Sequence, residues 1–143
     1  MPSGYFDAER ATLEALFQGA FSATTYVAYE NVPFAQPEAS PWVRMTIRPG
    51  LGQSAALGGA FHRYAGAVIV QCFVPEETGT KPGRDLADAA AAVFLDASGR
   101  GKQVSTTNGY ITFGTPYLEA AGAESGFLQL NVVVPYQRDQ ALT

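Results

Sequence analysis

The chain has 143 residues, enough for one domain with a hydrophobic core, and its net charge is −4. Only 15% of its residues are charged, against roughly 25% in an average soluble domain, while 12% are aromatic. The single cysteine and the single histidine exclude an internal disulfide, a cysteine-rich zinc site and any catalytic triad that does not use His62. Because no stretch resembles a leader peptide or a membrane span, we expect a soluble, cytoplasmic single domain over residues 1–143.

The first predicted element is a helix over residues 5–18. Phe6, Leu13 and Phe17 fall near one stripe of that helix, and charged residues such as Glu9 fall on its other faces. This pattern is typical of a surface helix that packs one apolar side against a core.

A short strand over 24–30 follows, and then a loop over 31–41, where three prolines remove backbone donors. The clearest strand in the chain covers 42–48. Its residues alternate strictly, with Val43, Met45 and Ile47 on one side and Arg44, Thr46 and Arg48 on the other.

Residues 49–63 hold four glycines without an apolar period, which predicts a long loop. Residues 64–74 are apolar on both faces, which predicts a central strand covered on both sides. Leu86, Ala90 and Phe94 then recur at helical spacing and predict a second helix over 84–95.

The last third of the chain predicts mostly strands. We expect a hairpin at 102–107 and 109–115 turning near Asn108, a surface loop with a short helical turn at 115–126, a strand at 127–135 and a flexible tail at 136–143. These elements together predict an α+β fold, with two helices packed on one face of a mostly antiparallel sheet.

The charges are segregated along the chain. No acidic residue lies between Glu38 and Glu76, whereas Arg44, Arg48 and Arg63 all do. A subunit with one basic edge and an otherwise acidic surface attracts its own copy head to tail, and such contacts can close into a ring. The alternative is that these arginines only solvate the outside of a sheet.

Sequence signals for chemistry are weak. His62 is the one side chain that ordinarily titrates near neutral pH, and Asp85 and Asp88 share a helix side without the ligand pattern of a metal loop. The glycine-rich stretch at 50–59 lacks the lysine and hydroxyl ending of a phosphate loop. We therefore predict no enzyme activity, no metal, no cofactor and no specific binding of nucleic acid, although a small ligand-binding domain or enzyme that uses His62 is an alternative.

Six short motifs occur in an order that resembles the tail terminator, or tail completion, proteins of long-tailed bacteriophages and prophages. The motifs are NVPF (31–34), PWVRMTIRPG (41–50), LGG (57–59) followed by Arg63, GAVIVQCFVP (66–75), LAD (86–88) and VVVPYQRD (132–139). The chain departs from the pattern at Glu76–Glu77, where smaller residues are common, and at Phe127 and Tyr136, where other aromatics often stand.

The resemblance implies a structural virion assembly protein with an α+β fold. It implies a hexameric ring that caps the last ring of tail-tube subunits, stops polymerisation of the tube and presents a surface to the head-side neck protein, with DNA passing through. Such a protein is made in the bacterial host cytoplasm and resides at the neck-proximal end of the virion tail, with no membrane partner. The alternative within the same class is another neck or minor head–tail joining protein.

For this role, we predict that the basic segment contacts neighbouring subunits and that the loop over 49–61 reaches a neighbouring subunit or the tail tube. The predicted interface residues are Arg44, Arg48, Gln53, Leu57, Phe61 and Arg63.

Overall fold

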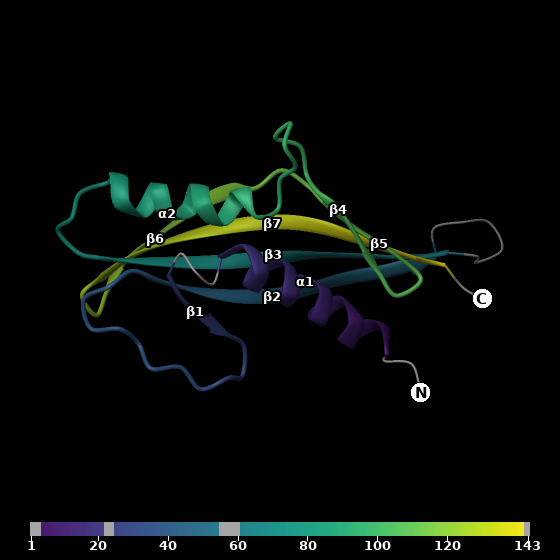
Figure 1. Cartoon of the computed structure of the whole chain (residues 1–143), viewed down its shortest axis with the longest axis horizontal. Coiled ribbons are helices and arrows are strands. Elements are labelled where there is room, and N and C mark those ends of the chain that lie inside the picture. The colour runs from purple at the N-terminus through teal and green to yellow at the C-terminus, as the bar shows by residue number, and fades with distance from the viewer. Residues whose placement is uncertain (1–3, 22–24, 55–60, 142–143) are drawn as a thin grey trace.

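A computed structural model describes residues 4–21, 25–54 and 61–141. In these residues two helices and seven strands follow one another (Figure 1). The elements are α1 (Tyr5–Phe21), β1 (Tyr26–Tyr29), β2 (Trp42–Ser54), β3 (Phe61–Pro75), α2 (Lys81–Ala92), β4 (Gln103–Thr106), β5 (Gly109–Phe113), β6 (Tyr117–Glu124) and β7 (Phe127–Ala141).

All seven strands belong to one curled sheet with the order β1-β2-β3-β7-β5-β4. Strand β7 pairs with β3 along its whole length, and its other edge is shared between β6 and β5. The sheet is mixed, because β1 runs parallel to β2 while the other pairs are antiparallel. The α+β prediction is therefore confirmed, and the expectation of a mostly antiparallel sheet needs this correction.

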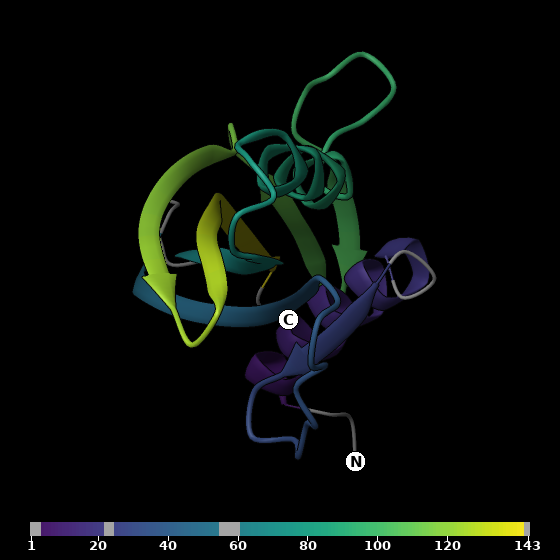
Figure 2. The same ribbon diagram turned by 90° about the vertical axis from the view of Figure 1, so that its left-hand side faces the viewer.

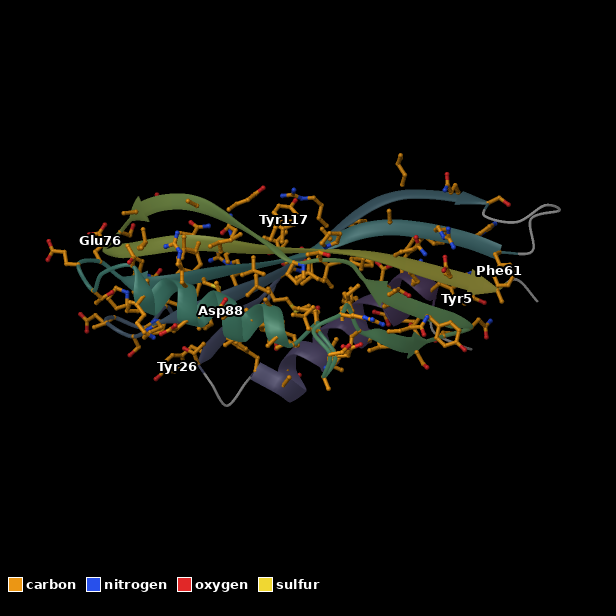
Figure 3. The ribbon with its side chains drawn as sticks, turned by 90° about the horizontal axis from the view of Figure 1, so that it is seen from above. Tyr5, Tyr26, Phe61, Glu76, Asp88 and Tyr117 are labelled. Atoms are coloured by element: carbon orange, nitrogen blue, oxygen red, sulfur yellow. The ribbon has the colours of Figure 1, made fainter. Side chains whose placement is uncertain are left out.

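Both helices cover the same face of the sheet, as predicted (Figures 2 and 3). Helix α1 contributes Leu13, Phe17 and Phe21 to the main core, and the stacked rings of Phe17 and Phe94 lie 6.0 Å apart. Helix α2 approaches the sheet closely at Gly83, where a Cβ would lie 2.8 Å from the Leu130 side chain. The core thus forms between two helices and alternate positions of the long strands.

The same face carries a buried polar cluster beneath the first half of α1. Glu9, predicted on a polar side of the helix, is only 6% exposed, and Arg138 is 1% exposed. The Arg138 Nε donates to Glu9 Oε1 over 2.7 Å, and the Tyr136 hydroxyl donates to Glu9 Oε2 over 3.0 Å. The Arg138 Nη1 donates to Gln140 over 2.6 Å, so the cluster ties α1 to the end of β7.

Three predictions about loops and ends are wrong. Strands β2 and β3 extend into the predicted loop at 49–63, where the register shifts between Pro49 and Gly52 at a bulge. Residues 117–124 form β6 instead of a loop, because they pair with β7. Their alanine-rich sequence has little strand preference of its own and does not predict this pairing. The predicted tail at 136–143 is ordered strand as far as Ala141, because Tyr136, Arg138 and Gln140 are buried.

Candidate self-association surface

The face of the sheet turned away from both helices, called the outer face below, is the surface on which the predicted interface residues gather. Val68, Val70, Cys72 and Val74 of β3 point into the helix-covered core, so the intervening residues of β3 point outward. Residues directly opposite one another in neighbouring strands share a face, which extends the assignment across the sheet.

Five of the six predicted interface residues lie on this outer face. Arg44 and Arg48 pair in register with outward-facing residues of β3, and Gln53 pairs with Arg63 beyond the bulge. Phe61 begins β3 and is 47% exposed (Figure 3). Leu57 lies outside the described residues.

The three arginines differ in how they are held. Arg63 donates to Asp139 on the neighbouring strand over 2.7 Å, and this hydrogen bond holds the pKa of the Asp139 carboxyl below its usual value. Arg44 lies over the rings of Trp42 and Phe73, 5.2 and 5.9 Å from their centroids. Arg48 is exposed and has no ion pair within residues 4–21, 25–54 and 61–141. Of these three arginines, Arg48 is therefore the one most free to bind a partner.

An aromatic cluster supports the Arg44 end of the outer face. Trp42 stacks on Phe73 with their centroids 4.0 Å apart, and Phe34 and Phe127 flank the indole. Because the cluster is buried, it fixes the end of β2 and gives the Arg44 guanidinium a flat apolar support.

Strand β6 supplies the acidic side of the same face. Glu119 and Glu124 pair with the outward-facing Asn131 and Phe127 of β7, and both are exposed. Figure 3 shows Tyr117 of β6 on the side of the sheet opposite the helices. Arg48 and Glu119 line opposite sides of one hollow of about 340 Å³, whose floor includes Gln71 and Asn131. The outer face is thus a shallow trough with basic residues on β2 and acidic residues on β6.

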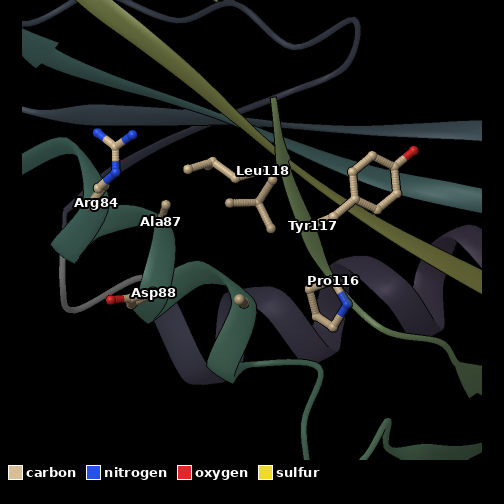
Figure 4. Close-up of a pocket in the computed structure, with 8 residues that line it drawn as sticks. Arg84, Ala87, Asp88, Pro116, Tyr117 and Leu118 are labelled. Carbon is tan, nitrogen blue, oxygen red and sulfur yellow. The ribbon is translucent and has the colours of Figure 1, made fainter. Parts of the chain in front are cut away.

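A second hollow, of about 320 Å³, lies between α2 and β6 on the other side of the sheet. Figure 4 shows Leu118 of β6 pointing toward Ala87 of α2, with Arg84 and Asp88 on the helix. Leu118 is 41% exposed, so β6 presents apolar surface on one side and charge on the other.

The residues considered for chemistry lie elsewhere. His62 points to the helix-covered side of β3, with its ring 6.2 Å from that of Tyr64. Burial raises the pKa of the Cys72 thiol to about 12, which keeps it a poor nucleophile. Among the described residues no group of three or more His, Cys, Asp and Glu could hold a metal, and no helix there is long and apolar enough to cross a membrane.

Sequence reasoning missed the acidic half of this surface. Tyr117, Glu119 and Glu124 lie in the segment predicted to be a loop, so nothing in the alternation of that segment placed them on a common face. The available signal was indirect: without another strand beside it, the second edge of β7 would have no backbone hydrogen-bond partners.

Comparison with known proteins agrees with this architecture. A family model described as phage tail terminator protein matches residues 8–124. Nine chains of solved structures match the fold, and one of them aligns with a TM-score of 0.62 and 16% identity over 90% of this chain and 94% of its own length. No curated protein matches.

The chain is thus an α+β protein whose curled mixed sheet carries two helices on one face and leaves the other face charged and free of helices. The chain belongs to the phage tail terminator family. It therefore has a structural role in phage tail assembly, in a non-enzymatic family, and is a component of the virion tail.

Proposed function

We propose that copies of this chain close into a ring, hexameric in the assembled tail, that caps the tail tube. The ring stops polymerisation of the tube and offers its other side to the head-side neck protein, while DNA passes through its opening. The family match over residues 8–124 is the observation that carries this proposal.

The outer face supports ring closure in particular. A closed ring built head to tail needs two different contact surfaces on each subunit. The chain has a basic strand, β2, flanked on its far side only by the short β1, and an acidic strand, β6, three strand positions away. Arg44, Arg48, Gln53, Phe61 and Arg63 are proposed to contact a neighbouring subunit or the tube from the basic side.

Tail length is the decisive measurement. Deleting the gene from its phage or prophage should give tail tubes of uncontrolled, excessive length in negative-stain electron micrographs, and a plasmid copy should restore uniform tails. Tails of normal length that fail to join heads would instead identify another neck component.

A second measurement tests capping directly. Adding the purified chain to tail-tube protein should shorten the tubes and leave a ring at one end of each. Tubes that grow equally long with and without the chain would contradict capping.

A further inference from the structure

Charges at the two edges of the outer face lack ion-pair partners within the subunit. Arg44 and Arg48 of β2 and Glu119 and Glu124 of β6 are exposed, and none of them has an ion pair among residues 4–21, 25–54 and 61–141. Three strand spacings separate β2 from β6, roughly 14 Å along the sheet. Arg48 and Glu119 line one hollow of the outer face, and Arg44 and Glu124 line another, yet no ion pair joins them among the described residues, so both sets of charges stay available on the same side.

The spacing of the charges along their strands also matches. Across β3, Arg44 lies level with Asn131 of β7 and Arg48 lies level with Pro135, so the two arginines are four positions apart along the sheet. Glu124 and Glu119 pair with Phe127 and Asn131, again four positions apart, because the β6 irregularity between Ala120 and Gly122 absorbs one residue. One shift by four positions, roughly 13 Å, therefore brings both basic residues opposite both acidic ones.

An apolar pair falls into the same alignment. Leu51 lies in the β2 bulge at the level of Ala65, two positions beyond Arg48, and is 87% exposed. Tyr117 lies two positions beyond Glu119 on β6 and is 52% exposed. The four-position shift that pairs the charges therefore also brings these two side chains to one level.

We propose that the β2 edge of one copy lies beside the β6 edge of the next copy, with three side-chain pairs across the contact. The pairs are Arg44 with Glu124, Arg48 with Glu119 and Leu51 with Tyr117. This inference rests on the proposed ring and specifies its subunit contact. The partner is a second copy because the two edges are complementary in charge sign, in spacing and in apolar level.

Side chains, not a backbone ladder, define this contact. Pro49 has no N–H to offer, and the bulge between Pro49 and Gly52 interrupts the edge of β2. Strand β1 covers β2 only from Trp42 to Met45, and beyond it the Glu30 carboxylate accepts the Ile47 N–H over 2.7 Å, so no strand pairs with this edge at Arg48. The Arg48–Glu119 pair should accordingly matter more than the Arg44–Glu124 pair.

Charge reversal tests the contact, with assembly followed by light scattering at increasing protein concentration, alone and with tail tubes. Arg48→Glu and Glu119→Arg should each raise the concentration for half-assembly about tenfold or more, because an attraction becomes a repulsion at every contact. Arg100→Glu, at an exposed arginine away from this edge, should assemble like wild type.

Mixing the two single variants provides the sharper result. In an alternating ring of Arg48→Glu and Glu119→Arg subunits, every contact again joins opposite charges, so the mixture should regain wild-type assembly. Circular dichroism and thermal melting establish that each variant is folded. Arg48→Gln and Glu119→Gln, which remove a charge without reversing it, should weaken assembly less than the charge reversals do.

The failures are distinguishable. Folded single variants that assemble like wild type, or a mixture that does not recover, would overturn this pairing and leave the ring intact. A wild-type chain that stays monomeric both alone and on tubes would overturn the ring itself.

Discussion

Strand β7 packs one row of side chains against two different helices, and the two halves of that row are chemically opposite. Beneath α2 the row is apolar, with Leu130, Val132 and Val134 at most 4% exposed. Beneath α1 it continues as Tyr136, Arg138 and Gln140, which are equally buried. A strand can therefore keep its two-residue period through a polar stretch, provided that the covering helix supplies partners, as Glu9 does.

The two halves also differ in what a substitution leaves behind. Removing an apolar group leaves a cavity, whereas removing one member of an ion pair leaves a buried charge without a counterion. The Arg138 Nη2 already has no hydrogen-bond acceptor among the described residues. The cluster therefore holds no unused acceptor for this group.

The largest effect is expected from Arg138→Met, which leaves Glu9 buried and unpaired. It should lower the free energy of unfolding by about 3–5 kcal/mol in urea denaturation. The double variant Glu9→Leu/Arg138→Met should recover much of this loss, because both charges are then absent. Leu130→Ala, in the apolar half, should cost about 2–5 kcal/mol with no such rescue. Equal losses in the single and double Arg138 variants would show that the charges are not coupled.

A smaller effect is expected at Gly66, where β3 passes beneath Tyr136. A Cβ at this position would lie 2.6 Å from the Tyr136 hydroxyl oxygen and 2.9 Å from the Arg48 carbonyl oxygen. Gly66→Ala should therefore destabilise the fold by about 1–3 kcal/mol, measured by thermal or urea unfolding. Gly114→Ala is the matched control, since its nearest atom would be 3.5 Å away, and a comparable loss there would remove the steric explanation.

The contrast within β7 also explains what could be predicted from the sequence. Apolar alternation around Val43 identified the part of β2 under the helices, because each apolar side chain carries its own signal. The apolar run at 64–74 identified β3, but the prediction that it is covered on both sides needs correction, since both helices pack on one face of it. The polar half of β7 carried no such signal, since its burial depends on Glu9, more than a hundred residues away in the chain.

The candidate surface divides in the same way. Arg44 and Arg48 were placed on one face by the alternation of β2, and the structure agrees. Glu119 and Glu124 were missed because alanine and glycine give β6 little intrinsic strand preference, so β6 exists by pairing with β7. Residues of a proposed contact, such as Glu119 and Glu124, can thus lie on a strand that forms only because a neighbouring strand pairs with it.

The smallest effect is expected from the partly exposed Arg63–Asp139 pair, which joins β3 to the end of β7. The hydrogen bond from Arg63 lowers the pKa of Asp139 below its ordinary 3.8, so the native state binds fewer protons than the unfolded state in the acidic range. The pair therefore stabilises the fold above about pH 4, and this contribution is lost as the pH falls through the lowered pKa. Asp139→Asn should melt slightly below wild type at pH 7, with the gap closing on acidification. Glu38→Gln, at an exposed carboxylate without an ion pair among the described residues, is the control and should show no such convergence. If the difference in melting temperature between Asp139→Asn and wild type does not change with pH, the carboxylate charge is not what stabilises this end of the sheet.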